Sequence, residues 1–184
     1  MPYPAEKIQA SHLPGLTFRI VEVHDLTALQ EISAQTFLES YAWGNSAESM
    51  QLYIDKNFSQ ERLSVEMLDP GSTFWFVCSV DKPVAYLKVN TGNSQTELRN
   101  NDCLEIERIY VLQSFQGKGI GKFLCQKAFE MARQRKLTFV WLGVWAENSK
   151  AIQFYSRLGF EAFDRHIFIL GEEEQSDIMM KIAV

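Results

Sequence analysis

The chain has 184 residues, of which 46% are hydrophobic and 22% are charged, and this is the composition of one folded globular domain. It excludes a disordered or fibrous protein, and a net charge of −5 argues against a generally basic nucleic-acid-binding protein. The longest apolar stretch, residues 139–146, is far shorter than the roughly 20 residues that span a membrane. The first seven residues lack the basic start and apolar core of a secretory signal. We therefore expect a cytoplasmic protein without a membrane or nucleic-acid partner, and the sequence leaves open whether it forms a homodimer.

The cysteine and histidine residues show neither a disulfide framework nor the spacing of a metal site. They are Cys78, Cys103 and Cys125, together with His12, His24 and His166. An odd number of cysteines without metal-ligand spacing is typical of reduced thiols in the cytoplasm. We accordingly expect no bound metal ion.

In the first part of the chain, residue periodicity predicts one strand followed by three helices. Alternating apolar residues indicate a strand over 16–23, and Asp25 is placed to cap a helix over 26–41. Asn and Ser open a shorter helix over 45–54, and a third helix is expected over 59–68, before a turn rich in Pro and Gly.

After these helices the pattern changes to strands that alternate with two helices. Two runs of aromatic and β-branched residues, 73–80 and 83–90, are separated by Asp81 and Lys82, which indicates a hairpin. The remaining predicted elements are a strand over 104–111, a helix over 120–136, a strand over 139–144, a helix over 148–158, and strands over 162–169 and 177–182. A hairpin followed by a β-α-β passage favours a mixed α/β sheet over a doubly wound one.

The most informative segment is the glycine-rich turn of residues 116–122, Gln-Gly-Lys-Gly-Ile-Gly-Lys, between a predicted strand and a predicted helix. Glycine lets a backbone turn tightly and approach a ligand closely. The free N–H groups at the start of the following helix can then hold a phosphate, with help from the helix dipole. Between Lys118 and Lys136 there are six basic residues and one acidic residue, which favours an anionic ligand.

Two other phosphate-binding motifs do not fit this turn. A dinucleotide-binding G-x-G-x-x-G motif needs a third glycine at position 122 or 124, where the chain has Lys122 and Leu124. A P-loop needs glycine at position 116 and serine or threonine at position 123, where the chain has Gln116 and Phe123. The glycines alone leave open a turn that only connects two elements.

Three motifs in and around this turn resemble signatures of the GNAT N-acetyltransferase family. They are Gln116-x-x-Gly119-x-Gly121, which matches the family's acetyl-CoA pyrophosphate motif, Glu107–Val111, which resembles its fourth strand, and Asn148-x-x-Ala151-x-x-x-Tyr155-x-x-x-Gly159-Phe160, which resembles its second signature. Their order and spacing agree with the family over residues 104–160. Weaker similarity to the bacterial spermidine/spermine N-acetyltransferase branch is carried by residues 35–37, 86–90, 141–145 and 168–181.

The resemblance implies a single domain over residues 1–184, with a mixed, mostly antiparallel twisted sheet flanked by helices. Residues 25–68 would form the acceptor side and residues 104–160 the acetyl-CoA-binding core. The implied activity is transfer of an acetyl group from acetyl-CoA to a primary amine, by direct attack with a general base and a general acid. A small polyamine such as spermidine or spermine is the leading acceptor. Acetylation of a protein N-terminus or lysine, and a CoA-binding sensor without turnover, are the alternatives.

By the same resemblance, the cofactor is held by a strand, the glycine-rich turn and a later helix. The residues expected to contact it are Ile109, Tyr110, Val111, Gln116, Gly117, Lys118, Gly119, Ile120, Gly121, Lys122, Asn148 and Tyr155. The backbone of residues 109–111 would pair with the pantetheine arm, and one of its N–H groups would donate to the thioester oxygen. Asn148 would also cap its helix, and capping alone would explain its identity.

Proton transfer needs further side chains, because an alkylamine with a pKa near 10.4 requires about 4–5 kcal/mol to become neutral at pH 7. Glu105 and Glu107 lie on one face of the strand that leads to the cofactor, so they are the candidate bases, although two solvated carboxylates would show the same pattern. Family members also place this group on the next strand, where this chain has Gly143. The resemblance makes Tyr155 the general acid that protonates the departing CoA thiolate; a packing role is the alternative.

The acceptor side is expected to be acidic and aromatic. Between Glu22 and Asp69 there are nine acidic and two basic residues, and a negative wall would attract a cationic polyamine. Ordinary solvated helix faces would carry similar charge. The candidate acceptor-binding residues are Glu39, Tyr41 and Trp43, with Glu48 and Tyr53 as further candidates.

Overall fold

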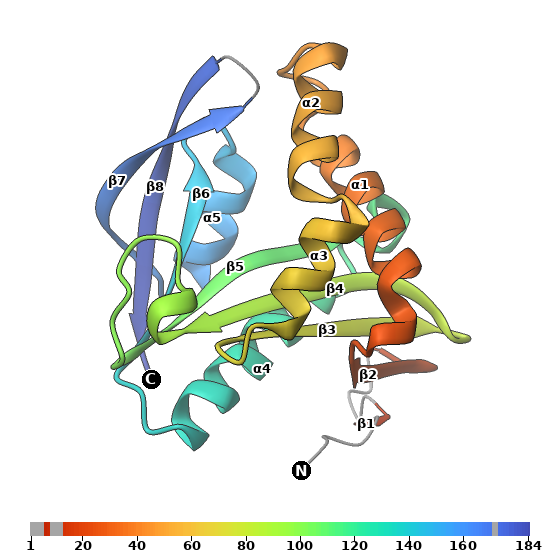
Figure 1. Ribbon diagram of the computed structural model, residues 1–184. Helices are drawn as coiled ribbons and strands as arrows, with labels where there is room; N and C mark the ends of the chain where they lie inside the picture. Colours follow the sequence, from red (N-terminus) through yellow and green to blue (C-terminus); the bar gives the residue numbers. More distant parts are fainter. Residues whose placement is uncertain (1–5, 8–12, 171–172) are drawn as a thin grey trace.

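A computed structural model describes residues 6–7, 13–170 and 173–184 of the chain (Figure 1). Its strands form one eight-stranded sheet in the order β1-β2-β3-β4-β5-β6-β8-β7. The strands are β1 (Glu6–Lys7), β2 (Leu16–Ile20), β3 (Ser72–Ser79), β4 (Lys82–Thr91), β5 (Cys103–Val111), β6 (Phe139–Trp145), β7 (Glu161–Leu170) and β8 (Glu173–Ala183). Neighbouring strands are antiparallel except for β5 and β6, which are parallel. The predicted mixed, mostly antiparallel sheet is therefore confirmed.

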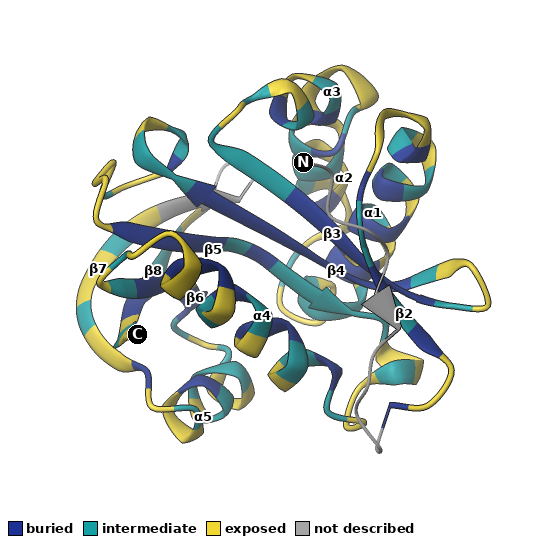
Figure 2. Cartoon of the chain, turned by 90° about the horizontal axis from the view of Figure 1, so that it is seen from below, coloured by how far each residue is buried: buried dark blue, intermediate teal, exposed yellow. Residues whose placement is uncertain are grey.

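Helices cover both faces of this sheet. The helices of the described residues are α1 (Leu26–Tyr41), α2 (Ala47–Asn57), α3 (Gln60–Leu68), α4 (Ile120–Gln134) and α5 (Ser149–Arg157), with short 3-10 turns η1 (Val23–Asp25), η2 (Gly92–Ser94) and η3 (Gln113–Phe115). Helices α1, α2 and α3 lie over one face, and α4 and α5 lie over the other (Figure 2). No helix among the described residues is long and apolar enough to span a membrane.

Apolar side chains pack on each face of the sheet and hold these helices in place. Helix α4 is amphipathic, and Leu124 and Ala128 from its inner face are fully buried against strand residues such as Ile106. On the opposite face Phe37 of α1 stacks on Tyr53 of α2, with ring centroids 4.3 Å apart. Truncation of a buried leucine such as Leu124 to alanine is expected to cost about 2–5 kcal/mol of folding free energy.

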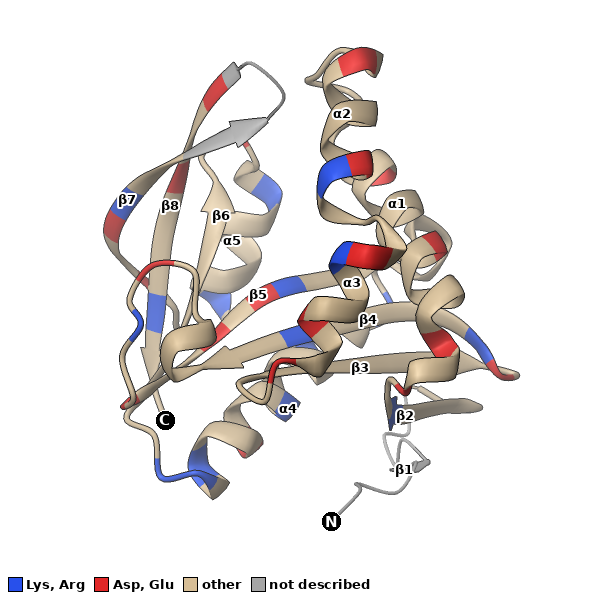
Figure 3. Cartoon of the chain, in the orientation of Figure 1, with Lys and Arg blue, Asp and Glu red and all other residues tan. Residues whose placement is uncertain are grey.

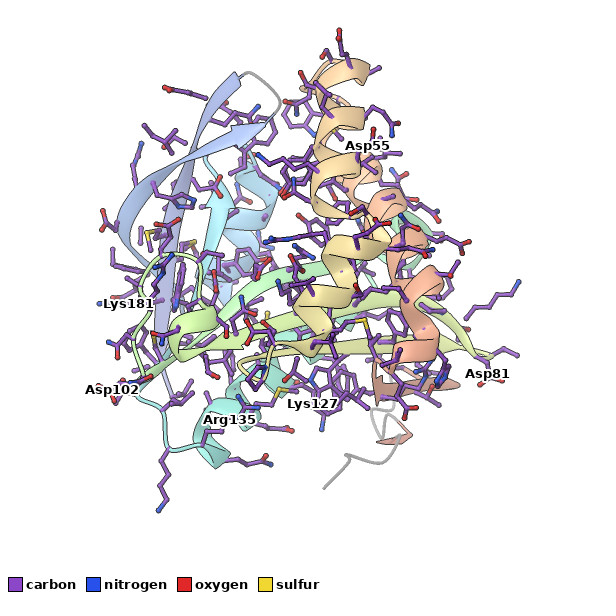
Figure 4. The ribbon with its side chains drawn as sticks, viewed as in Figure 1. Asp55, Asp81, Asp102, Lys127, Arg135 and Lys181 are labelled. Atoms are coloured by element: carbon purple, nitrogen blue, oxygen red, sulfur yellow. The ribbon has the colours of Figure 1, made fainter. Side chains whose placement is uncertain are left out.

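The β3–β4 hairpin is confirmed, but its turn lies one residue earlier than expected. Ser79 pairs with Lys82, so Val80 and Asp81 form the two-residue loop. Both have positive φ angles, 47° and 66°, as the tight turns that match strand twist require. Asp81 accordingly stands at the tip of the hairpin in Figure 4.

Asp25 precedes α1 as predicted, yet its side chain does not cap that helix. Its carboxylate accepts hydrogen bonds from Arg19, at 2.6 and 2.8 Å, and from the backbone N–H of Glu22 at 2.9 Å. The Arg19 guanidinium is the main reason that the pKa of Asp25 lies below its usual range. These bonds end β2 at Ile20, before the predicted limit at residue 23, because they fold the chain back toward α1.

Other element boundaries also differ from the sequence prediction, and helix α2 runs over Ala47–Asn57 instead of 45–54. Helix α4 ends at Gln134, two residues early, because Lys136 takes a left-handed φ of 57° and its N–H bonds back to Arg133. Strand β8 begins at Glu173 instead of residue 177, because pairing with β7 continues along the hairpin up to its turn. Long-range pairing partners of this kind leave no local signal in the sequence.

Candidate active site

The sheet opens between its two parallel strands. Strands β5 and β6 pair only from Cys103 with Phe139 to Glu105 with Trp141, after which β5 continues with β4 and β6 continues with β8. The β5 edge that faces β6 therefore has no strand partner among the described residues beyond Glu105. In Figure 1, β6, β7 and β8 stand apart from the strands that run across the molecule.

A β-bulge accounts for this opening. Lys88 of β4 pairs with Arg108, and the next residue, Val89, pairs with Ile106, so Glu107 is an extra residue on β5. A bulge of this kind bends its strand, increases the local twist and re-aims side chains. The bulge therefore turns β5 away from β6 and directs Glu107 toward the opening.

A cavity of about 690 Å³ occupies the opening. Its walls come from the end of α1, from β5, from the glycine-rich turn and the start of α4, from β6, and from α5. All predicted cofactor-binding residues except Lys118 line it, namely Ile109, Tyr110, Val111, Gln116, Gly117, Gly119, Ile120, Gly121, Lys122, Asn148 and Tyr155. The structure thus brings together segments that lie up to 46 residues apart in the chain, from 109 to 155.

The glycine-rich turn presents backbone amides to this cavity. Gly117 and Gly119 have φ angles of 73° and 88°, a left-handed conformation that glycine adopts without steric cost. The first hydrogen bond of α4 runs from the N–H of Phe123 to the carbonyl oxygen of Gly119, at 3.0 Å. The N–H groups of the residues between them precede this bond, so they have no acceptor within the helix and are placed to bind an anion.

The basic residues after this turn do not gather at the cavity. Lys122 lines it, whereas Lys118 lies over the ring of Phe115, with Nζ 4.6 Å from the centroid. Lys127 pairs with Glu130 farther along α4, and Arg135 follows the end of that helix (Figure 4). The amides and one lysine therefore carry the anion-binding character, and the wider basic run does not.

Helix α5 supplies a capped start and a buried phenol. The Asn148 side-chain oxygen accepts a hydrogen bond from the N–H of Ala151 at 3.1 Å, so it caps the helix as predicted. Tyr155 is 8% exposed, and its ring packs between those of Phe154 and Phe160. Burial raises the pKa of Tyr155 well above its usual value, so the phenol carries its proton at neutral pH.

Glu105 does not reach the cavity. Its side chain is 2% exposed, and its carboxylate accepts hydrogen bonds from Asn90 Nδ2 at 2.9 Å and from the backbone N–H of Thr96 at 3.0 Å. Burial raises its pKa to about 7, although the bonds from Thr96 and Asn90 oppose this rise. The two candidate bases therefore stay close enough to share Asn90 Nδ2 as a donor, but only Glu107 lines the cavity.

Glu107 lines the cavity but is already paired with cations. Its oxygens lie 2.6 Å from Lys88 Nζ and 3.0 Å from Arg108 Nη2, and Asn90 donates to it. Burial favours protonation of Glu107, but Arg108 and Lys88 outweigh it and hold the pKa below its usual range. Glu66 of α3 completes the cluster, since it also pairs with both cations. Charged segments of α3, β4 and β5 accordingly gather where these elements meet (Figure 3).

The three leading acceptor-side candidates, Glu39, Tyr41 and Trp43, all line the cavity. A Glu39 oxygen accepts from the backbone N–H of Gln113 at 2.6 Å, and the Tyr41 hydroxyl lies 3.3 Å from that of Tyr110. Trp43 is 70% exposed, and its ring lies 5.3 Å from that of Trp145. This end of the cavity is therefore walled by aromatic rings.

The acidic run of residues 22–69 does not form the expected negative wall. Among its members, the cavity lining includes Glu39 alone; Glu66 is paired with cations, and Asp69 holds a turn through Ser94. Glu48 is exposed on α2 and Tyr53 packs in the core under α1, so neither lines the cavity.

Sequence reasoning missed the buried ion cluster and part of the cavity wall. The sequence does signal the cluster at Lys88, because a lysine inside a run of aromatic and β-branched residues needs a buried counter-charge. Phe154 and Lys150 line the cavity without a distinguishing pattern. The described residues contain no group of three or more side chains suited to a metal ion, and His12 lies outside them.

The residues of the cavity fit a coenzyme A molecule. Its diphosphate requires N–H donors, which the start of α4 presents, and its pantetheine amides require main-chain partners, which the free edge of β5 offers. The phenol of Tyr155 lies on the same cavity. The same cavity therefore offers N–H donors suited to the diphosphate of coenzyme A and a protonated phenol suited to its thiol group.

Comparisons with known proteins agree with this geometry. The chain matches the Acetyltransferase (GNAT) family over residues 27–160. An uncharacterized N-acetyltransferase from the pepI 3' region of Lactobacillus delbrueckii subsp. lactis is 39% identical over 173 residues, which cover 94% of this chain and 99% of the relative.

Solved structures share the fold at lower identity. The PaiA N-acetyltransferase of Thermoplasma acidophilum, solved in complex with coenzyme A, has a TM-score of 0.76 at 20% identity and covers 92% of this chain and 99% of its own. The spermidine/spermine N-acetyltransferase SpeG of Vibrio cholerae has a TM-score of 0.66 at 20% identity and covers 93% of this chain and 95% of its own. The chain therefore belongs to the GNAT family and is an acetyl-CoA-dependent N-acetyltransferase.

Proposed function

We propose that the protein acetylates a primary amine of a small cationic molecule, with polyamines such as spermidine and spermine as the first candidates. The observation that carries this proposal is the acceptor end of the cavity, where Tyr41, Trp43 and two carboxylates, Glu39 and Glu107, surround one opening. Aromatic faces and carboxylates are the groups that bind alkylammonium ions. A structural neighbour that acts on spermidine and spermine supports the same acceptor class.

The closed acceptor side favours a small amine over a protein segment. Gln175 of β8 donates a hydrogen bond to Asn45, in the link between α1 and α2, at 2.7 Å. Trp43 and Trp145 form a second contact between the same two parts of the molecule. Both contacts join the α1–α2 segment to the β6–β8 half of the sheet, so a peptide in an extended conformation would have to displace them.

In the proposed mechanism, bound acetyl-CoA supplies the thioester that the amine attacks. The amides that begin α4 and Lys122 hold the diphosphate. The backbone of residues 109–111 positions the pantetheine arm, and an N–H group there stabilises the negative charge that develops on the thioester oxygen. Tyr155 gives its proton to the sulfur that leaves. Of the two glutamates predicted as bases, Glu107 is the one at the cavity, and a water molecule between it and the amine would relay the proton.

The test is release of free thiol from acetyl-CoA over a panel of putrescine, spermidine, spermine, benzylamine and a short peptide with a free N-terminus. We expect turnover with the amines to exceed turnover with the peptide by at least tenfold in kcat/KM. The same panel is measured with the Tyr155→Phe variant. Its matched control is Tyr53→Phe, which removes a phenol hydroxyl on the other face of the sheet. Preference for the peptide would favour a protein acetyltransferase. CoA binding without turnover of any acceptor would favour a sensor.

A further inference from the structure

A carboxylate from β8 occupies the space that a side chain on β6 would fill. Gly143 lies in the middle of β6 and lines the cavity. A Cβ atom at this position would stand 3.3 Å from Asp177 Oδ2 and 3.5 Å from His166 Cε1. The glycine therefore leaves the carboxylate of Asp177 next to the cavity wall, with the imidazole of His166 beside it.

The sheet register fixes this arrangement. His166 of β7 pairs directly with Asp177 of β8, so their side chains stand on the same face of the sheet. The last paired residues of β5 and β6 are Glu105 and Trp141, and two residues farther on Glu107 and Gly143 line the cavity from its two sides. Asp177 itself is not among the lining residues, and it lies directly beside Gly143 on the β6 side, whereas Glu107 lines the β5 side.

The two carboxylates differ in their partners. Glu107 contacts Lys88, Arg108 and Asn90, so its charge is already neutralised. Asp177 forms no ion pair with any residue that the structure describes, and burial raises its pKa, while His166 opposes this rise. An unpaired, partly buried carboxylate gains most from a cation that comes to it and holds a proton more readily than Glu107 does.

The imidazole offers a path for that proton away from the cavity. His166 Nε2 lies 3.8 Å from Glu97 Oε1, on the side where Glu97 is 41% exposed. His166 Nδ1 is buried and has no hydrogen-bond partner among the described residues. Cε1, which is bonded to both nitrogens, faces the same point as the Asp177 carboxylate, so the ring lies beside that carboxylate and near the partly exposed Glu97.

We propose that Asp177, with His166 beside it, binds the ammonium group of the acceptor amine at the cavity wall next to Gly143 and takes up its proton. This inference rests on the proposed function and gives it a second carboxylate, on the opposite wall from Glu107. Asp177 is a catalytic residue in this scheme, and His166 is a positioning and relay residue.

The proton balance of the reaction fits this assignment. The ammonium loses one proton to the Asp177 carboxylate, and it passes by way of His166 to solvent. The neutral nitrogen then attacks the thioester carbonyl carbon, a C–N bond forms and the C–S bond breaks with its electron pair on sulfur. The nitrogen loses its second proton through water to the Glu107 carboxylate, which releases it to solvent, and the sulfur receives a proton from Tyr155, which is then reprotonated from solvent. The net products are the acetylated amine, free CoA thiol and one proton.

The first test compares Asp177→Asn with Asp164→Asn, the same change at an exposed aspartate of β7. We expect Asp177→Asn to lower kcat/KM for the amine about 100-fold, with the KM for acetyl-CoA and the affinity for CoA within twofold of wild type. Asp164→Asn should leave all values within twofold. Amine turnover that survives Asp177→Asn would overturn this inference alone, whereas a wild-type protein that acetylates no amine would overturn the proposed function with it.

The second test is the pH profile of kcat/KM for the His166→Gln variant. The titratable groups that face Asp177 are His166 on β7 and Tyr41 on α1, and Glu97 lies next to His166; β6 presents Gly143 there. Because His166 lowers the pKa of Asp177, its removal should move the acid limb of the profile to higher pH. An unchanged limb would contradict the relay.

Gly143→Ala is a further variant that leaves the carboxylate in place. Its methyl group would press on Asp177 and His166, so the KM for the amine should rise at least threefold while CoA binding is retained. An unchanged KM would also overturn the inference, even where Asp177→Asn fails to fold.

Discussion

Arg108 of β5 and Glu66 of α3, 42 residues apart in the chain, meet in a two-point ion pair, with Nη1 2.8 Å from Oε2 and Nη2 3.0 Å from Oε1. Arg108 also contacts Glu107, the bulged residue at the cavity, and Lys88 lies between the two glutamates. Helix α3 is thereby joined to the point where β5 bends. The ion cluster holds one wall of the active site through a helix that does not itself line it.

Lys88→Met tests whether this cluster supports the fold. Lys88 is 4% exposed at its side chain, and its loss leaves two buried glutamates with Arg108 as their remaining buried cation. We expect the free energy of unfolding, measured by urea denaturation, to fall by about 3 kcal/mol or more. Lys82→Met, at the exposed start of β4, should change it by less than about 0.5 kcal/mol. Equal effects of the two changes would show that the cluster carries no special stability.

Glu105→Gln should alter how stability depends on pH. The folded chain holds the Glu105 proton up to a pH of about 7, whereas the unfolded chain releases it near 4.5. The folded state therefore binds more protons between these values, and the contribution of Glu105 to stability is lost as pH rises, by up to about 3 kcal/mol. Above the pKa of Glu105 in the folded state, this contribution no longer changes with pH.

Urea unfolding at pH 5 and pH 8 measures this effect. The free energy of unfolding of Glu105→Gln minus that of wild type should be larger at pH 8 than at pH 5, by up to about 3 kcal/mol. Glu61→Gln, at an exposed position of α3, should show the same difference at both pH values. A Glu105→Gln difference that does not change with pH would mean that Glu105 is ionised throughout this range.

Tyr155→Phe should lower kcat without weakening CoA binding. The ring and its contacts with Phe154 and Phe160 remain, while the proposed proton donor for the leaving sulfur is lost. We expect a fall of about 100-fold in kcat, measured by thiol release, and a CoA dissociation constant within threefold of wild type by calorimetry. A kcat that changes less than twofold would assign the residue to packing.

Gly119→Ala should weaken CoA binding beyond its effect on folding. Gly119 has a φ of 88°, and an alanine there costs about 1–2 kcal/mol in a left-handed conformation. Gly15→Ala is the matched control, because Gly15 has a φ of 76° and does not line the cavity. Both variants should lose similar stability in thermal unfolding, and Gly119→Ala alone should raise the CoA dissociation constant tenfold or more. Equal CoA affinities would place the diphosphate elsewhere.

The sequence predicted the elements whose signals are local. The amphipathic pattern of α4, the turn between β3 and β4 and the cap at Asn148 each depend on residues within one or two turns of chain. Nearly all residues predicted to hold the cofactor line one cavity for a related reason, since their motifs are short and lie close together between residues 107 and 160.

The acceptor side was predicted less well because its residues meet through long-range pairing. Glu105 and Glu107 stand two residues apart in the sequence, and a bulge that depends on β4 separates their surroundings. Asp177 lies beside the cavity-lining Gly143 only because β8 pairs with β6 there. Neither the position of a bulge nor a partner strand 34 residues away, as between 143 and 177, can be read from periodicity.

The parting of β5 and β6 has a consequence for solubility. A strand edge with unpaired amides normally invites another protein chain, and proteins protect such edges with charge, proline or a covering element. Here the main-chain groups of residues 109–111 on this edge face inward, between α4, α5 and the returning strands, and the Val111 carbonyl accepts a hydrogen bond from Gln116. The molecule can thus keep the main-chain edge that we propose for the pantetheine arm without exposing it to the strands of other protein chains.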